Sequence, residues 1–311
     1  MGQAYGQGRS GRAGELYEVT SGSRQAVVTE QGATLFRVRW DGAELLATGA
    51  DDGYGGVGSH GQLLVPWPGR VRHAAYEFDG QVHHLMVNDQ VTGSSIHGLA
   101  RWLAWQPQEH SRDRLVLGCR QLAVPGYPFP LAYEQSYTWL PDCLEVVLVA
   151  SNIGNRTAPF GYGCHPYFSV GSPTVDDDIL RVPAGRYYPE RDDHSISGPA
   201  LPVDGTAFDF RQPKAVGTTH FDVTLTDLQR DEDGRVEVNF RSARSAASVT
   251  CKYDPPIDFI QLYSGDTLPS GQRQGMAIEP YTSAPDAFNN GIGLARLPPG
   301  GTFRVRWTLS A

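Results

Sequence analysis

The amino-acid sequence predicts an all-β protein, built as a single large antiparallel β-sandwich. Three observations carry this prediction. Apolar and polar side chains alternate with a period of two in successive segments, as expected for strands with one buried face. The chain contains 36 glycines and 22 prolines, which favour many tight turns. No segment of residues 15–311 keeps a 3.6-residue period for more than about two turns, so long helices are not expected.

The length and composition indicate one domain. A chain of 311 residues buries roughly three quarters of its unfolded surface on folding, which is enough for a large core of its own. The composition does not change in a linker-like way between residues 15 and 311, so this range is predicted to be a single domain. Residues 1–14 are rich in Gly, Gln, Ser and Arg and are predicted to be a flexible tail.

The strands can be placed along the chain by their alternation and their turns. Residues 35–40 alternate apolar and charged side chains and then meet Asp41-Gly42, which is a hairpin signal. Further hairpins are predicted for 76–80 with 81–85, for 133–140 with 144–150 through Pro141-Asp142, and for 236–240 with 247–253. Residues 303–309 alternate again as the last strand. The stretch FRVRW occurs at 36–40 and at 303–307, which two strands with one wet face explain without an internal repeat.

The charge and the apolar pattern exclude several classes of protein. With 26 basic and 34 acidic residues the net charge is −8, which disfavours a nucleic-acid partner. The sequence has no run of 18 apolar residues, so a membrane-spanning helix is not expected, and its start lacks the apolar stretch of a secretory signal. The four cysteines, at 119, 143, 164 and 251, are scattered, which is typical of a cytoplasmic protein with reduced thiols.

Motifs for cofactors and metals are weak. G-x-G-x-x-G occurs at 6–11 and at 53–58, but neither stretch has the preceding strand and following helix that dinucleotide binding needs. No His and Cys residues have the spacing of zinc ligands, and the adjacent His83 and His84 face opposite sides of a strand. We therefore expect no cofactor and no metal site.

Three ionisable residues stand in unusual surroundings. His97 and His165 are each accompanied by glycine and aromatic residues, as the floor of a cleft would be. Glu279 interrupts an apolar strand, and a carboxyl partly removed from water there has a raised pKa that suits a general base. The competing interpretations are a structural role for each histidine, and a strand-end glutamate that is turned toward solvent.

Five blocks in order along the chain resemble the aldose 1-epimerases, or galactose mutarotases. The resemblance extends from about residue 65 to residue 289. Its blocks are Pro66–Arg70 with Tyr76–Gly80, Ile96–Gly98 with Trp105, His165–Phe168, Phe221-Asp222 before Leu225, and Gln261–Gly265 with Glu279–Asn289. Two positions differ from the family pattern: Gly69 stands where the family usually has Asn, and Pro166 stands where it more commonly has Ser.

The resemblance implies a galactose mutarotase-like supersandwich and an isomerase without a cofactor. Such an enzyme interconverts the α and β anomers of a free aldohexose by acid- and base-catalysed opening and closure of the ring. By resemblance His165 is the acid and Glu279 is the base, while Arg70, His97 and Asp222 bind hydroxyls of the sugar. An imidazole near its free pKa can give and retake a proton at neutral pH, which agrees with this role for His165.

The same resemblance implies the partners. The expected partner is a small sugar, with no nucleic acid and no membrane, and the expected assembly is a monomer or a homodimer. Tyr281, Trp105 or Phe168 would offer an apolar platform to the C–H face of the sugar.

Three alternatives stay open. Arg101, after the His-Gly pair, is similar to the hexose-6-phosphate 1-epimerase branch, whereas Ser283–Asn289 fits the branch that acts on unphosphorylated aldoses. A glycosidase would use Asp222 and Glu279 as paired carboxylates. A carbohydrate-binding module would keep the fold without catalysis, and its mark would be loss of His165 or Glu279, which are both present.

Overall fold

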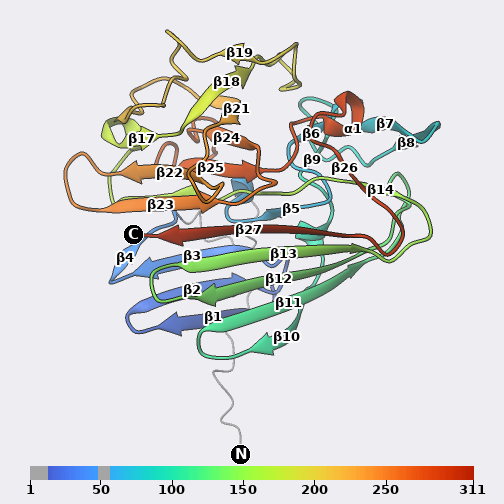
Figure 1. The fold of residues 1–311 in the computed structure, drawn as a ribbon, viewed down its shortest axis with the longest axis horizontal. Coiled ribbons are helices and arrows are strands. Elements are labelled where there is room, and N and C mark those ends of the chain that lie inside the picture. Colours follow the sequence, from blue (N-terminus) through green and yellow to red (C-terminus); the bar gives the residue numbers. More distant parts are fainter. Residues whose placement is uncertain (1–12, 48–56) are drawn as a thin grey trace, which may run out of the picture.

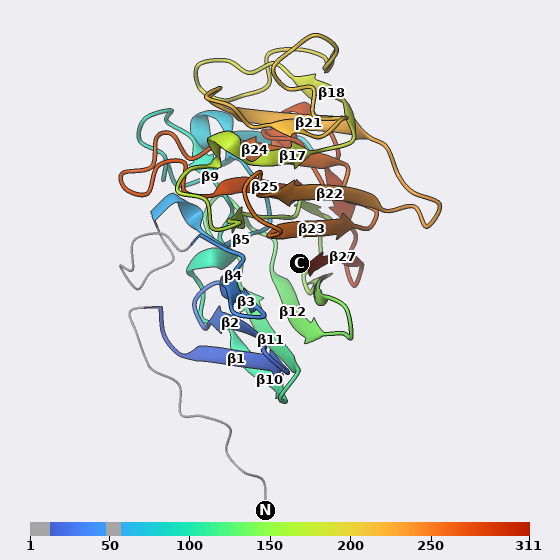
Figure 2. The same ribbon diagram turned by 90° about the vertical axis from the view of Figure 1, so that its left-hand side faces the viewer.

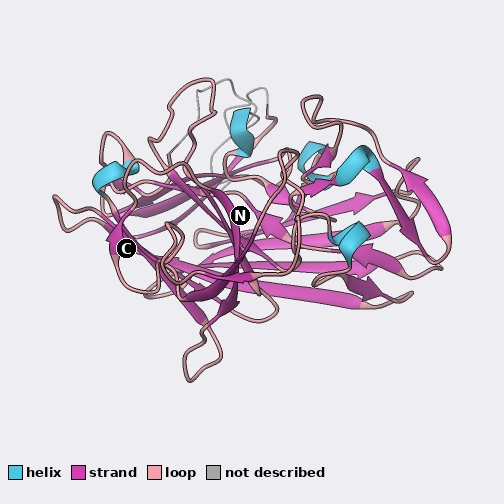
Figure 3. Ribbon diagram, turned by 90° about the horizontal axis from the view of Figure 1, so that it is seen from above, coloured by secondary structure: helices cyan, strands magenta, loops and turns pink. Residues whose placement is uncertain are grey.

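The computed structural model describes residues 13–47 and 57–311. Within these ranges the regular structure is almost all strand, and the helices are single short turns (Figure 3). The prediction of an antiparallel all-β protein is therefore confirmed. The G-x-G-x-x-G stretch at 6–11 lies outside the described residues, as does most of the one at 53–58. Of the predicted tail, Ala13 and Gly14 are described, and the buried Ala13 accepts a hydrogen bond from the N–H of Gln31.

A four-stranded sheet begins the described chain. Its strands, in spatial order, are β1 (Leu16–Ser21), β2 (Arg24–Thr29), β3 (Leu35–Trp40) and β4 (Ala43–Glu44). The predicted hairpin after residue 40 is confirmed, because Trp40 pairs with Ala43 across Asp41 and Gly42. Both turn residues have positive φ, at 47° and 89°, which is the backbone that a two-residue hairpin with Asp-Gly favours.

A nine-stranded sheet forms the long face of the molecule (Figure 1). Its strands, in spatial order, are β10 (Gln106–His110), β11 (Arg114–Gln121), β12 (Leu131–Trp139), β13 (Leu144–Asn152), β27 (Thr302–Ser310), β23 (Ser248–Tyr253), β22 (Val236–Arg241), β17 (Ile179–Arg181) and β20 (Lys214–Ala215). The predicted hairpins β12–β13 and β22–β23 are confirmed. The strand β27 joins them, because it pairs with β13 on one side and with β23 on the other.

An eight-stranded sheet carries the functional site. Its strands are β19 (Leu201–Pro202), β18 (Ala184–Tyr188), β21 (Asp222–Leu228), β24 (Phe259–Tyr263), β25 (Met276–Tyr281), β15 (Gly163–Cys164) and β5 (Leu63–Leu64), with β16 (Tyr167–Phe168) also paired to β25. Every residue of β25 is buried, which explains why its sequence is apolar apart from Glu279.

Short elements connect the sheets. Three ribbons pair β6 (Arg70–Val71) with β9 (Ser95–Ile96), β7 (Ala75–Phe78) with β8 (Gln81–His84), and β14 (Ala158–Phe160) with β26 (Ala295–Leu297). The β7–β8 ribbon confirms the predicted hairpin of residues 76–85. The helical turns are η1 (Val57–Ser59), η2 (Arg72–Ala74), η3 (Ala100–Trp102), η4 (Val175–Asp177) and α1 (Ala287–Asn290).

One hydrophobic cluster runs through the large sheets. It includes Val38 of β3, Leu148 of β13 and Ile278 of β25, none of them more than 1% exposed. Figures 1 and 2 show the four-stranded sheet lying beside β11 and β12, which explains how β3 shares this core. The two FRVRW stretches belong to β3 and β27, which lie in different sheets. No helix among the described residues is long and apolar enough to cross a membrane.

Candidate active site

A cavity of about 690 Å³ opens beside the eight-stranded sheet. All five residues that the sequence proposed for catalysis and sugar binding line it: Arg70, His97, His165, Asp222 and Glu279. They come from distant parts of the chain, so the sheet pairing described above is what assembles them.

The floor of the cavity holds His165 and Glu279. Glu279 lies in β25, and His165 directly follows β15, which is the neighbouring strand. The Nε2 of His165 lies 3.4 Å from the Oε1 of Glu279, and the Tyr281 hydroxyl donates a hydrogen bond of 2.7 Å to the Oε2. His165 is 6% exposed and Glu279 is 1% exposed. The alternative of a glutamate turned toward solvent is therefore wrong.

Backbone and ring contacts fix the orientation of His165. Its N–H donates to the carbonyl of Gln62, and its carbonyl accepts from the N–H of Gly61. The ring of Tyr167 stacks on the imidazole, with 4.9 Å between centroids. These contacts leave Nε2 as the ring atom that faces Glu279.

Burial moves the two pKa values of this pair in opposite directions. Removal from water lowers the pKa of His165 to about 3, and His60 and Arg101 act in the same direction. Burial raises the pKa of Glu279 well above its ordinary value, partly offset by the hydrogen bond from Tyr281. Both shifts favour the uncharged form of each group. The expectation of an imidazole near its free pKa is therefore wrong, and the two shifts together favour a proton on the carboxyl of the pair.

Arg70 and His97 meet through the ribbon β6–β9, in which Arg70 pairs with Ile96. The Nε of Arg70 donates to the Oδ2 of Asp89 at 2.7 Å, which fixes the guanidinium at the wall of the cavity. The N–H of Gly69 donates to the Nδ1 of His97 at 3.2 Å. The ring proton of neutral His97 is therefore on Nε2.

His97 and Gly98 adopt a backbone that few sequences allow. Their φ angles are 64° and 67°. A Cβ at position 98 would lie 2.1 Å from the carbonyl oxygen of Val65, so glycine is required there. His97 is thereby placed against His165, with 5.4 Å between ring centroids and the rings nearly perpendicular. Burial lowers the pKa of His97 well below its ordinary value, and Arg101 acts in the same direction.

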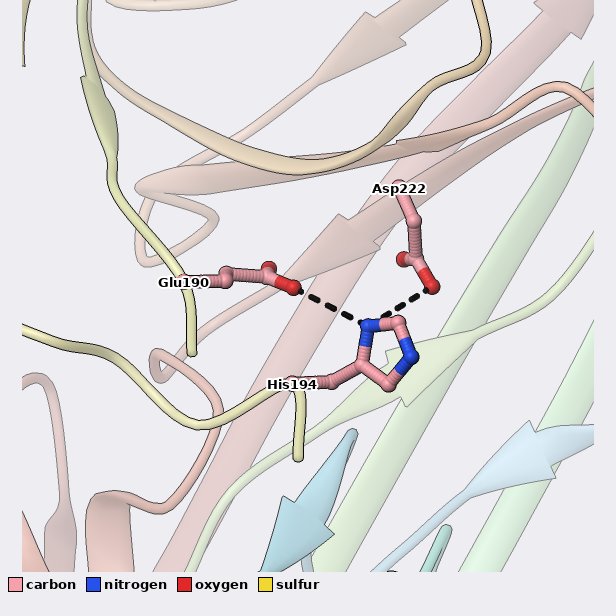
Figure 4. A group of neighbouring side chains, drawn as sticks. All are labelled: Glu190, His194 and Asp222. Atoms are coloured by element: carbon pink, nitrogen blue, oxygen red, sulfur yellow. Dashed lines mark hydrogen bonds and ion pairs between the residues drawn. The ribbon is translucent and has the colours of Figure 1, made fainter. Parts of the chain in front are cut away.

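The rim of the cavity holds Asp222 within a cluster of ionisable groups (Figure 4). Asp222 begins β21, and its Oδ1 accepts a hydrogen bond of 2.6 Å from the Nε2 of Gln261. The Nδ1 of His194 lies 3.3 Å from the Oδ2 of Asp222 and 3.3 Å from the Oε2 of Glu190. Figure 4 shows this imidazole nitrogen between the two carboxylates.

Glu190 and His194 reach the rim on the loop between β18 and β19. Within this loop Glu190 pairs with Ile196, and the N–H of His194 donates to the carbonyl of Arg191. An ion pair of 2.7 Å between the Nε of Arg72 and the Oδ2 of Asp193 connects the loop to η2, next to Arg70. The loop is thus held to the segment that follows Arg70.

Sequence reasoning missed Glu190 and His194. Their only signal is a spacing of four residues, in a loop that no periodicity marks. Together with Asp222 each offers one ligand atom, all within 4.8 Å of one another, so these three residues could hold a metal ion. The fold therefore brings together a candidate group that the spacing in the sequence does not reveal. The expectation of no metal site and of metal-independent activity stays a prediction.

The expected aromatic platforms are only partly suitable. Trp105 and Phe168 are fully buried and do not line the cavity, and Tyr281 lines it with 1% exposure. Trp102, which follows Arg101, lines the cavity and is 48% exposed. Trp102 therefore exposes more aromatic surface beside the cavity than the three expected residues do.

Arg101 is a buried cation whose hydrogen-bond acceptors are neutral. Its Nη1 donates to the Oγ of Ser59 and the Oε1 of Gln62, and its Nη2 donates to the carbonyl of Ile96. Its Nε–H has no partner among the described residues. Burial lowers its pKa to about 10.

The fold first places this protein in a structural class. Solved structures with the same architecture include a putative aldose 1-epimerase of Escherichia coli K12, with TM-score 0.81, 24% identity and coverage of 95% of this chain and 98% of that one. The aldose epimerase homologue of C. elegans has TM-score 0.83 and 20% identity, with coverage of 95% and 98%. The architecture is therefore that of the galactose mutarotase-like β-sandwiches.

Sequence comparison then gives the family. The family model "Aldose 1-epimerase" matches residues 15–310, and the chain belongs to this family. The uncharacterized protein YihR of Escherichia coli (strain K12) is 30% identical over 294 residues, which cover 94% of this chain and 92% of that protein. The galactose mutarotase of Pongo abelii is 29% identical over 250 residues, covering 74% and 70%. Membership of this family indicates a carbohydrate epimerase.

Proposed function

We propose that this protein is an aldose 1-epimerase that interconverts the α and β anomers of a free aldohexose. The observation that carries the proposal is the pair of His165 and Glu279, 3.4 Å apart at the floor of a cavity that is large enough for a hexose. Galactose mutarotases among the relatives support a free sugar as the substrate.

The reaction needs one proton to be given and one to be taken. In the proposed mechanism Glu279 removes the proton of the anomeric hydroxyl while His165 donates a proton to the ring oxygen. The C1–O5 bond breaks, the C1–C2 bond of the open aldehyde turns, and closure by the reverse transfers gives either anomer. Donor and acceptor exchange roles on closure, so the pair is regenerated without a cofactor.

The buried pair is suited to these transfers because it holds one mobile proton. Burial favours this proton on Glu279. A sugar hydroxyl that donates to Glu279 favours the ionised carboxylate. The proton can then pass across the 3.4 Å gap to His165, which becomes the acid. Arg70, His97 and Asp222 orient the ring from the walls, through their place around the same cavity.

Polarimetry tests the proposal. Freshly dissolved α-D-glucose and α-D-galactose should lose optical rotation faster with the protein than with buffer alone, without any release of a second sugar. The matched control is Glu279→Gln, which keeps the shape of the site. A wild-type protein that accelerates no free aldose would contradict the proposal, and release of reducing sugar from a glycoside would instead favour the glycosidase alternative.

A hexose 6-phosphate is the second candidate substrate, and Arg101 is the observation that favours it. A buried guanidinium with neutral acceptors and an unused Nε–H is suited to an anionic group. The same polarimetric assay with α-D-glucose 6-phosphate separates the two candidates. A kcat/KM for the phosphorylated sugar more than about tenfold above that for glucose would favour this second candidate.

A further inference from the structure

We propose that Tyr281 is a positioning residue, whose hydroxyl holds the Oε2 of Glu279 and leaves the Oε1 as the single oxygen that exchanges protons. This inference rests on the proposed function, because it takes Glu279 as the base. It replaces the role of an apolar platform that the sequence suggested for Tyr281. The contact between the two side chains can also be measured without any sugar.

Strand β25 brings the ring of Tyr281 beside the carboxyl of Glu279. Residues two apart in a strand face the same side of the sheet, and both of these residues line the cavity. The hydroxyl of Tyr281 donates to the Oε2 at 2.7 Å, while the Nε2 of His165 lies 3.4 Å from the Oε1. The two oxygens of one carboxyl therefore have different partners.

The cross-strand neighbour of Glu279 does not hold its carboxyl. Gln261 lies opposite Glu279 in the pair of β24 and β25. The Nε2 of Gln261 donates to Asp222, and its Oε1 accepts from the hydroxyl of Thr224, so both ends of this amide are engaged. Of the hydrogen bonds found among the described residues, only that from Tyr281 reaches the carboxyl of Glu279. The orientation of the carboxyl therefore depends on one hydroxyl.

The ring of Tyr281 occupies space that a glycine leaves open. Gly163 of β15 pairs with Tyr281, and a Cβ at position 163 would lie 2.7 Å from the Cδ1 of the ring and 2.8 Å from its Cε1. The same Cβ would lie 2.7 Å from the Cβ of Pro68, so it could not move aside. Glycine thus permits the close approach of ring and backbone. A ring packed in this way directs its hydroxyl at one atom.

Burial keeps this hydroxyl protonated. Tyr281 is 1% exposed, and burial, followed by the nearby Glu279, raises its pKa well above the ordinary value. At neutral pH the hydroxyl is therefore a donor to Glu279 and not a competing base. Beyond His165 and Tyr281, the groups that act on Glu279 are Asp222 and Arg70, which act through their charge alone.

One oxygen of Glu279 then serves both proton transfers. In the neutral carboxyl the Oε2 that accepts from Tyr281 is the carbonyl oxygen, so the acidic proton is on Oε1, facing the Nε2 of His165. This proton passes to His165, and the same Oε1 then takes the proton of the anomeric hydroxyl. The carboxyl does not have to rotate between the two transfers, which keeps it in the reactive geometry.

Kinetics of Tyr281→Phe test the inference, because this variant removes the hydroxyl and keeps the ring. In polarimetric assays with α-D-galactose, kcat should fall about tenfold with KM within about twofold, since the carboxyl can then turn Oε1 away from the sugar. The matched control is Tyr127→Phe, which removes a buried hydroxyl that donates at 2.7 Å to the carbonyl of Pro159, outside the cavity. This control should keep wild-type kinetics. An unchanged kcat in Tyr281→Phe, an equal loss in both variants, or a rise of KM in place of the fall of kcat would overturn the proposal.

Infrared spectroscopy measures the contact without sugar. The C=O stretching band of the protonated carboxyl of Glu279 is identified by its loss in Glu279→Gln. In Tyr281→Phe this band should move to higher wavenumber, because a hydrogen bond accepted by the carbonyl oxygen weakens the C=O bond. In Tyr127→Phe the band should stay in place. A band that does not move in Tyr281→Phe, or the absence of such a band from pH 5 to pH 8, would overturn the proposal.

The two measurements separate this inference from the proposed function. If the wild-type protein converts no sugar while the band still moves in Tyr281→Phe, the proposed function fails, and the hold of Tyr281 on Glu279 stands. If the wild-type protein is active and neither kcat nor the band responds to Tyr281→Phe, only the positioning role fails. Circular dichroism checks that both phenylalanine variants are folded.

Discussion

The floor and the rim of the cavity contain the same kinds of side chain, but these side chains differ in their exposure to solvent and in the direction in which the histidine pKa is shifted. At the floor His165 and Glu279 lie 3.4 Å apart, and at the rim His194 and Asp222 lie 3.3 Å apart. The floor side chains are 7% and 2% exposed, whereas those at the rim are 38% and 33% exposed. Burial lowers the pKa of His165, while its neighbours raise the pKa of His194.

The difference indicates that burial, rather than residue type or spacing, sets the direction in which the pKa of the histidine in such a pair is shifted. A dry pair favours neutral groups that share one proton, which suits proton transfer. A wetter pair favours two charges, which suit the binding of hydroxyls. Variants at the two regions test whether the floor carries out proton transfer and the rim binds the sugar hydroxyls.

The largest effect is expected at the floor. Glu279→Gln keeps the shape but cannot accept the anomeric proton, and His165→Asn cannot pass one to the ring oxygen. Each should lower kcat by at least ~10²-fold in polarimetric assays. Because the two groups act as a unit, the double variant should lose much less than the product of the single effects. Circular dichroism checks that both variants are folded, and a folded Glu279→Gln within a few-fold of wild type would place the base elsewhere.

Substitutions of the residues at the walls and rim should change KM more than kcat. Replacing Arg70, His97 or Asp222 with alanine removes a side chain that hydrogen-bonds a sugar hydroxyl in the proposed mechanism. The sugar ring is then misoriented. Loss of such a bond costs about 1.5–3 kcal/mol where a charge takes part, so KM should rise roughly tenfold to hundredfold for Arg70→Ala and Asp222→Ala. His97 is neutral, so its loss costs about 0.5–1.5 kcal/mol and KM should rise by roughly two- to tenfold. Steady-state kinetics on the true substrate measures this. The site map is wrong if all three variants keep wild-type kinetics.

The pH dependence of kcat/KM should follow the floor rather than free imidazole, because kcat/KM reports the ionisable groups of the free enzyme. The pair takes up a second proton only near the lowered pKa of His165, about 3, so kcat/KM should change less than about twofold from pH 7 to pH 5. It should fall on the alkaline side, as the pair loses its one proton above the raised pKa of Glu279. An acidic limb centred at pH 6.5 would show that His165 is not desolvated.

The buried carboxyl of Glu279 should destabilise the folded protein in a pH-dependent way. Above the ordinary pKa of 4.5 the unfolded chain releases the proton of Glu279, whereas the folded protein keeps it. The contribution of Glu279 to the unfolding free energy therefore falls as pH rises, by up to about 1.4 kcal/mol per pH unit until its folded pKa is reached, while the lowered pKa of His165 gives a contribution of opposite sign below pH 6.5. Denaturant titrations should show Glu279→Gln gaining stability over wild type from pH 5 to pH 8. A gain that is constant with pH would contradict a protonated Glu279.

The smallest effect is expected from chelation. The floor pair needs no Lewis acid to move its proton, so kcat should survive exhaustive treatment with a chelator. The cluster of Glu190, His194 and Asp222 makes this a real test, because these groups could hold a metal ion. Activity that collapses with chelator and returns with a divalent ion would move the chemistry toward the rim.

Local patterns predicted much of the fold and the core of the site. Alternation located β12, β13 and β27, because one face of each strand is buried and the pattern has a period of two. The sequence singled out Glu279 as a charged residue within an apolar strand. The structure agrees, because Glu279 is buried and only 1% exposed.

The rest depends on contacts between distant segments. The identical FRVRW stretches lie in different sheets, because pairing partners rather than local sequence assign a strand to its sheet. His194 approaches Asp222 only because β18 pairs with β21, and nothing near either residue encodes that neighbour. The lowered pKa of His165 likewise reflects the whole protein packed around it rather than the residues beside it in sequence.

The ion pair between Arg72 and Asp193 makes the site sensitive to the salt concentration of the solution. A neutral hexose carries no charge that dissolved salt could screen. The loop that brings His194 to Asp222 is nevertheless held by an ion pair whose side chains are 40% and 23% exposed, within reach of mobile counterions. Such a pair contributes up to about 1 kcal/mol at low salt. Affinity for an uncharged sugar should therefore decline by a few-fold between dilute buffer and molar sodium chloride, so that ionic strength acts on the site through its loop rather than through its ligand.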